Sequence, residues 1–150
     1  MTYLKNILTL VILVFFNTSL IASNPSNWTK YVEDNNLLIE YRYQNCQLSR
    51  FDEEKVILRL TNKLNKDISV SWKEEIWYDN ECINCNLKNE NEMFKTIQLK
   101  AKETLAGECD RNNRLTIFSK FSEKLIDMPG VNKIIELTKF ELKKIIISYE

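Results

Sequence analysis

The stretch from Val56 to Trp72, "VILRLTNKLNKDISVSW", decides the predicted fold because it holds two patterned segments around a polar turn. Apolar side chains recur at every second position of both segments, and they are Val56, Leu58, Leu60, Ile68, Val70 and Trp72. Strict alternation of apolar and polar residues is typical of a half-buried β-strand, and a cluster of Asn, Lys and Asp is typical of a loop. The stretch therefore predicts two antiparallel strands, each with one buried face.

The same alternation continues on both sides of this stretch. Further strands are predicted in the segments 36–46, 93–100, 103–109, 114–121 and 140–148, which brings the total to about seven. Short polar segments separate them, and neither a helical period nor an internal repeat is present. This pattern favours an all-β fold of two packed antiparallel sheets. The segment 123–137 remains open between a short helical turn before Pro129 and a crossover loop between the sheets.

Alternation also predicts which side chains form the core. The residues expected to face inward are Leu37, Ile39, Tyr41, Val56, Leu58, Leu60, Ile68, Val70, Trp72, Ile97, Leu99, Leu115 and Ile117. Glu74 falls on the same face as Trp72, where a carboxylate is unusual, so we expect the strand to leave the core or to bulge there.

Two segments resemble a known kind of domain. "VILRLTNKLNKDISVSW" resembles the strand–turn–strand of small secreted immunoglobulin-like and fibronectin-III-like sandwiches, and "TIQLKAKETLAGEC" (residues 96–109) is similar to an edge segment of bacterial cell-envelope sandwiches. The resemblance covers residues 37–121. It implies an Ig-like two-sheet sandwich of about seven strands and brings no activity with it. In antibody domains a buried tryptophan follows the first cysteine closely, whereas Trp72 comes 26 residues after Cys46.

The first 23 residues have the pattern of a secretory signal peptide. Lys5 supplies the positive charge, "ILTLVILVFF" (residues 7–16) is a short apolar run, and Ala22 and Ser23 are small residues suited to cleavage. The apolar run is shorter than the roughly 20 residues that a membrane-spanning helix needs. We therefore expect an exported protein, periplasmic or extracellular, with a single β-sandwich domain over residues 24–150 and no stable membrane insertion after cleavage.

Composition excludes several classes of function. The chain has 21 basic and 21 acidic residues, and loss of Lys5 with the signal peptide leaves a net charge of −1. Such a balance predicts no binding to nucleic acid. Histidine is absent, which removes Ser-His-Asp and Cys-His catalysis, and two glycines are too few for a phosphate-binding loop. We expect no enzyme and no cofactor, but a binding or structural module whose partner is an unknown protein or envelope component.

The four cysteines, Cys46, Cys82, Cys85 and Cys109, are the candidate site residues. An even number in an exported chain predicts two disulfides, for which three pairings are possible. Chain entropy favours a Cys46–Cys109 bridge, worth roughly 4 kcal/mol, with a separate Cys82–Cys85 bridge worth roughly 2 kcal/mol. Alternating strand directions would bring all four to one end of the sandwich.

Two alternatives for the cysteines stay open. Four thiolates at one end could hold zinc or Cu(I), for which a C-x-x-C is a suitable half-site. The pair could also exchange thiols, although the nearby carboxylates of Asp79 and Glu81 work against a reactive thiolate. The alternative function is therefore a periplasmic thiol-redox or metal-handling domain. Trp28 and Trp77 are the aromatic residues that we consider best suited to contact a ligand.

The signal-peptide pattern predicts the N-terminus of the mature protein. Cleavage after the small residues should leave a chain that begins at Ser23 or Asn24. Intact-mass measurement of the exported protein checks this expectation. An exported chain that still carries Met1 would contradict it.

Overall fold

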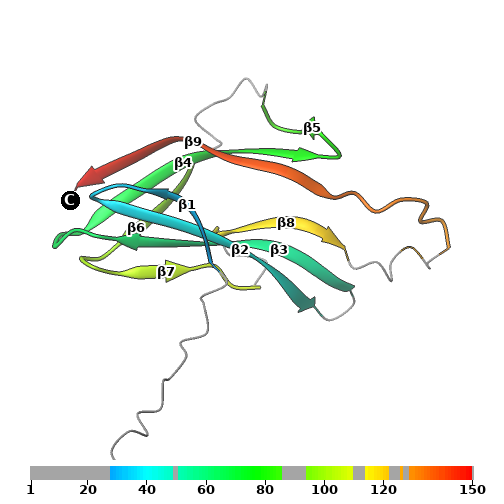
Figure 1. The fold of residues 1–150 in the computed structure, drawn as a ribbon, viewed down its shortest axis with the longest axis horizontal. Coiled ribbons are helices and arrows are strands. Elements are labelled where there is room, and N and C mark those ends of the chain that lie inside the picture. Colours follow the sequence, from blue (N-terminus) through cyan, green and yellow to red (C-terminus); the bar gives the residue numbers. More distant parts are fainter. Residues whose placement is uncertain are drawn as a thin grey trace, which may run out of the picture.

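The computed structural model describes residues 28–48, 51–85, 94–109, 114–121, 126 and 129–149, so the predicted signal peptide lies outside the described residues. The described residues form nine strands: β1 (Thr29–Glu33), β2 (Leu37–Leu48), β3 (Phe51–Asn62), β4 (Ile68–Tyr78), β5 (Glu81–Cys82), β6 (Phe94–Leu99), β7 (Thr104–Ala106), β8 (Thr116–Phe121) and β9 (Leu137–Tyr149). They build two packed antiparallel sheets, which confirms the predicted sandwich (Figure 1). Within the described ranges, no helix is long and apolar enough to cross a membrane.

The first sheet is built around the hairpin of β2 and β3. These strands pair along their whole length, from Leu37 opposite Asn62 to Leu48 opposite Phe51. On the outer side of β2 lies β1, and on the outer side of β3 lie both β7 and β8. Because β7 pairs with residues 59–61 of β3 and β8 with residues 53–57, the two behave as halves of one interrupted edge strand.

The second sheet has β4 at its centre. β9 follows one side of β4 from Ile68 to Tyr78, and Figure 1 shows these two long strands side by side. The other side is shared, because β6 pairs with residues 68–73 and β5 with residues 77–78. Within the described residues, β5 and β6 are therefore also two halves of one interrupted edge strand, with a gap opposite residues 74–76 of β4.

The core lies between the sheets and contains the side chains that alternation predicted. Of the thirteen, Tyr41 and Ile97 are partly buried and pack against the cluster, and the other eleven are buried in it. The sequence pattern missed Leu142, which is buried, and the partly buried Tyr31, Phe140 and Ile145. Of the open segment, residues 126 and 129–137 are described. Ile126 has the 3₁₀ conformation of a short turn before Pro129, and residues 129–136 contain no helix and lead into β9 of the second sheet, as a crossover loop would.

Aromatic rings close one side of the sandwich. Tyr31 of β1 stacks on Phe140 of β9 with ring centroids 5.7 Å apart, and Tyr41 of β2 meets the same ring edge-on at 5.2 Å. The backbone N–H of Leu142 donates to the Tyr31 hydroxyl at 2.8 Å. Because Leu142 belongs to an edge strand, this bond satisfies a donor that strand pairing leaves open. β1, which the sequence pattern did not predict, thus ties the two sheets together.

Asn62 organises the end of the sandwich where the chain crosses between the sheets. Its side chain is fully buried, and its amide nitrogen donates to the carbonyl oxygens of Lys66 and Lys100, both at 2.8 Å. Its amide oxygen accepts from the backbone N–H of Leu64 at 2.9 Å. The turn from β3 to β4 and the turn from β6 to β7 therefore meet at one side chain.

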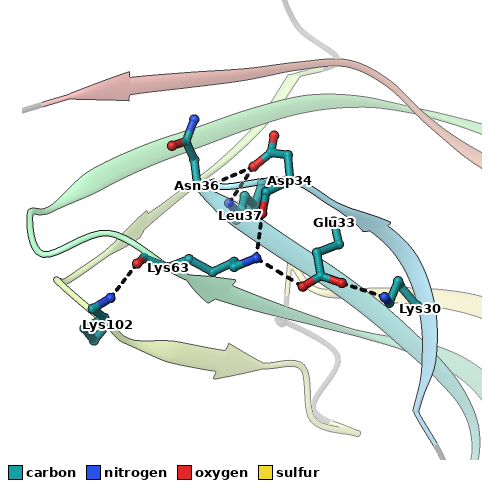
Figure 2. A network of polar contacts seen from close by, with 7 residues as sticks. All are labelled: Lys30, Glu33, Asp34, Asn36, Leu37, Lys63 and Lys102. Carbon is teal, nitrogen blue, oxygen red and sulfur yellow. Dashed lines mark hydrogen bonds and ion pairs between the residues drawn. The ribbon is translucent and has the colours of Figure 1, made fainter.

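A second polar network fastens β1 to the same end (Figure 2). The Lys63 ammonium lies 3.1 Å from a Glu33 carboxylate oxygen and 2.7 Å from the backbone oxygen of Asp34. The Asp34 carboxylate accepts from the backbone N–H groups of Asn36 and Leu37, which fixes the turn into β2. The ammonium of Lys102 in turn donates to the Lys63 carbonyl at 2.6 Å. This network joins the β1–β2, β3–β4 and β6–β7 turns, which indicates a structural role.

Candidate functional site

The structure pairs Cys46 with Cys109 and Cys82 with Cys85. No described cysteine is free. This is the pairing that chain entropy favoured, with one bridge across 63 residues of sequence and the other across three. The two crossed pairings are not formed.

The Cys46–Cys109 bridge lies on the outer face of the first sheet. Because side chains alternate along β2, Cys46 points away from the core that contains Ile39. Cys46 is nevertheless only 1% exposed, and Ile57 on the same outer face of β3 is fully buried. Nearby, the Lys55 ammonium donates to the Cys109 carbonyl at 3.1 Å and pairs with Glu53 at 3.0 Å. The bridge therefore closes a small second core and does not connect the sheets.

Glycine lets the chain leave the sheet to reach this bridge. The N–H of Gly107 donates to the carbonyl of Leu58, and the N–H of Leu58 donates to the carbonyl of Leu115, both at 2.9 Å. A Cβ on Gly107 would lie 2.3 Å from the Leu115 carbonyl oxygen, closer than any side chain allows. The interruption between β7 and β8 thus begins and ends at a single residue of β3, and Cys109 lies inside it.

The Cys82–Cys85 bridge closes a small loop at the edge of the second sheet. Between the two cysteines, Asn84 turns its side-chain amide toward β4. Its oxygen accepts from the N–H of Ile76 and its nitrogen donates to the carbonyl of Glu74, both at 2.8 Å. The N–H of Ile83 donates to the Ile76 carbonyl at 3.0 Å. Asn84 therefore occupies the gap between β5 and β6 and replaces the missing strand.

Both bridges lie toward the same end of the sandwich but in different sheets. In the strand register, Cys46 lies opposite Glu53 near the β2–β3 hairpin, and Cys82 lies opposite Trp77 near the end of β4. Tyr78 follows Trp77 in β4, and its hydroxyl donates to the Phe118 carbonyl of the first sheet at 2.8 Å. This bond places the end of β4 beside the first sheet. Within the described residues, no group of three or more His, Cys, Asp or Glu side chains is arranged to hold a metal ion.

The tryptophans that the sequence suggested as ligand contacts have partners within the fold. Trp28 lies under two guanidinium groups, those of Arg42 at 4.6 Å and Arg59 at 4.3 Å from the ring centre. The Lys139 ammonium lies 4.4 Å from the ring centre of Trp77. Both rings are partly buried. These contacts show how each ring is held and leave ligand binding by either ring a prediction.

Glu74 stays in the core-facing row of β4. The expectation that β4 leaves the core or bulges at Glu74 is wrong: the register shift between Ser71 and Lys73 comes from one extra residue in β9, and Glu74 is only 7% exposed. Its carboxylate pairs with the Lys95 ammonium at 2.8 Å and accepts from the Trp72 indole N–H at 3.3 Å. Lys95 of β6 thus supplies the compensating charge, which the sequence pattern of β4 alone could not reveal.

A cavity of about 520 Å³ lies at the same end of the sandwich, between the sheets and the loop before β9. One wall is aromatic, and the opposite wall comes from the loop. The lining residues are Tyr78, Phe118, Phe121, Gly130, Val131, Asn132, Lys133, Ile134 and Ile135. The rings of Phe118 and Phe121 lie 4.8 Å apart, and those of Tyr78 and Phe118 lie 6.2 Å apart. The sequence reading missed this site, although three apolar residues in a loop after a Pro-Gly pair were the available signal.

Among the described residues, two ion pairs lie at or beside the cavity. The Lys133 ammonium lies 2.8 Å from the Asp79 carboxylate, and this bond holds the pKa of Asp79 below its usual value. Lys120 pairs with Glu136 at 2.9 Å. Burial, together with the nearby Glu74 charge, raises the pKa of Tyr78, so its hydroxyl remains a neutral donor. The cavity is therefore apolar inside and has no unpaired charge among these groups.

Comparison with known proteins gives no further guide. No protein-family model matches the chain, and no curated protein or solved structure matches it either.

Removal of either disulfide tests their different structural roles. Replacing Cys46 and Cys109 together by alanine should lower the free energy of unfolding by roughly 4 kcal/mol, because the bridge closes a long loop. Replacing Cys82 and Cys85 together by serine should lower it much less, by at most roughly 2 kcal/mol, because their bridge closes a loop of only four residues. Thermal and urea unfolding of both double variants measure this. Early melting of the serine variant, with the alanine variant unaffected, would contradict the assignment.

Proposed function

We propose that this protein is an exported, non-catalytic binding module of the cell envelope that holds a small, uncharged hydrophobic molecule in the cavity beside Phe118. The cavity carries the proposal. Its volume of about 520 Å³ falls within the roughly 300–1,000 Å³ of small-molecule sites. One wall consists of aromatic rings and the other of aliphatic side chains. An apolar ligand between them would bury its own apolar surface and that of both walls, which favours binding.

The charges at the rim support a neutral ligand. Lys133 is paired with Asp79 and Lys120 with Glu136, so an anionic ligand would have to break an ion pair to gain one. The Asn132 side chain is exposed at the cavity and offers an amide to one polar group of the ligand. We therefore favour a ligand with an apolar body and a single uncharged polar end.

The chemistry of the lining supports binding without catalysis. Among the described residues, two titratable side chains line the cavity, Tyr78 and Lys133. The Tyr78 hydroxyl donates to the Phe118 carbonyl, and the Lys133 ammonium is held by Asp79. Proton transfer needs a group placed toward the reacting atoms with a suitable pKa, and these two groups are engaged with the protein itself.

Export is supported by two independent features of the chain. The first 23 residues have the pattern of a signal peptide, and all described cysteines are paired in disulfides. Disulfides persist in oxidising compartments such as the periplasm or the extracellular space.

A cavity-filling variant tests the proposal. Val131 lines the cavity, so Val131→Trp should occupy the space and weaken binding of the neutral fluorescent probe N-phenyl-1-naphthylamine about tenfold or more. Ile146→Trp is the matched control, because Ile146 is 52% exposed on β9 and does not line the cavity. Fluorescence titration of the purified mature protein gives both affinities.

The control should bind the probe as the natural protein does. Unchanged melting temperatures of both variants would show that loss of binding does not come from unfolding. Equal affinity of Val131→Trp and the natural protein would contradict the cavity as the binding site.

A further inference from the structure

Among the described residues, a side chain and not a strand closes the edge of β4 at one place. β6 pairs with β4 up to Lys73, and β5 begins its pairing at Trp77. Between these points, the Asn84 amide bonds to the N–H of Ile76 and the carbonyl of Glu74. An unpaired strand edge is a template for association with another strand, and proteins normally cover such edges.

The Cys82–Cys85 bridge holds Asn84 in this position. Asn84 lies inside the four-residue ring that the bridge closes, and its only neighbour between the cysteines is Ile83. The Ile83 side chain is 59% exposed, so packing contributes little to the position of the loop. Besides the bridge, the described contacts that hold the loop on β4 are the strand pairing of Cys82 with Trp77, the Ile83 N–H bond to Ile76 and the two bonds of Asn84. Opening the bridge therefore removes the main covalent restraint on the residue that covers β4.

The two bridges differ in how readily a reductant can reach them. Cys46 is 1% exposed, and Cys109, although partly exposed, has the Gln44 side-chain amide 3.4 Å from its sulfur. Cys82 and Cys85 are both partly exposed, in a loop at the edge of the sheet. Thiol–disulfide exchange requires a thiolate to approach a sulfur directly, so access decides which bridge reacts first.

We propose that the Cys82–Cys85 disulfide is a site of thiol–disulfide exchange with an external dithiol, and that its reduction uncovers the β4 edge at residues 74–76. A thiolate of the dithiol attacks one sulfur, the Cys82–Cys85 bond breaks, and a mixed disulfide forms. The second thiol of the reagent, as thiolate, then attacks its own sulfur in the mixed disulfide. The products are two protonated cysteine thiols on this chain and one disulfide on the reagent, so two electrons and two protons pass to the protein.

The Cys46–Cys109 bridge stays closed in this reaction and keeps the sandwich intact. The change is therefore local: Asn84 leaves Ile76 and Glu74, while the part of β4 that pairs with β6 keeps its partner. The inference is independent of the hydrophobic ligand, because neither cysteine lines the cavity.

A dithiothreitol titration of the purified mature protein tests both parts of the proposal. Alkylation followed by peptide mapping should show Cys82 and Cys85 labelled at a reductant concentration about tenfold or more below that required for Cys46 and Cys109. In the partly reduced protein, the backbone N–H of Ile76 should exchange with solvent about tenfold or more faster. The N–H groups of residues 68–73 should exchange as before.

Two variants in the oxidised protein separate the roles of the amide and the bridge. Asn84→Ala keeps the bridge but removes the amide, and should accelerate exchange at Ile76 without reductant. Ile83→Ala, in the same loop, should leave that exchange unchanged, because the Ile83 contact with β4 comes from its backbone. Simultaneous reduction of both bridges overturns the proposal, and so does an Ile76 amide that stays protected after the Cys82–Cys85 bridge is open.

Discussion

The side-chain amide of Asn62 sits where the chain passes between the two sheets, and the remaining geometry depends on it. Its nitrogen donates to Lys66 in the crossover from β3 to β4 and to Lys100 in the turn from β6 to β7, and its oxygen accepts from Leu64. A buried amide with satisfied bonds specifies one arrangement, because any shift would leave polar groups without water or partner. Two of the three passages between the sheets, β3 to β4 and β6 to β7, are therefore fixed at one point, which sets how β4 and β6 lie over β3.

Edges are the second constraint on this sandwich, and side chains complete them. Each sheet has one edge strand in two pieces, and each interruption contains a cysteine loop. In the first sheet Cys109 lies in the interruption and is bonded to Cys46 on the outer face of the sheet, where Ile57 is also fully buried. In the second sheet the loop turns Asn84 back to β4. The disulfides thus have different tasks, one to bury apolar surface and the other to cover backbone.

Alternation predicted the central strands and the core because each of these strands buries one face against the other sheet, as Leu58 and Val70 do. It could not predict that Ile57 is buried, since alternation places this residue on the outer face of β3. Burial of Glu74 depends on Lys95 in another strand, and the cavity depends on Val131 and Ile134 in a segment without period. Strand β1 is too short to show a clear pattern, and Tyr31 stabilises the fold through its contact with Leu142 of β9, which is far away in sequence. The local sequence pattern therefore predicted the strands of the two sheets, whereas the burial of Ile57 and Glu74 and the cavity depend on contacts between residues far apart in sequence.

The free energy of unfolding of the Asn62→Leu variant tests most directly whether the sheet crossings depend on this amide. Leucine has a similar volume but leaves the Lys66 and Lys100 carbonyls without their donor, so urea unfolding should show a loss of roughly 2–5 kcal/mol. Asn65→Leu in the same turn is the matched control, because Asn65 is exposed, and it should change stability by less than about 0.5 kcal/mol. An Asn62→Leu variant as stable as this control would contradict the account.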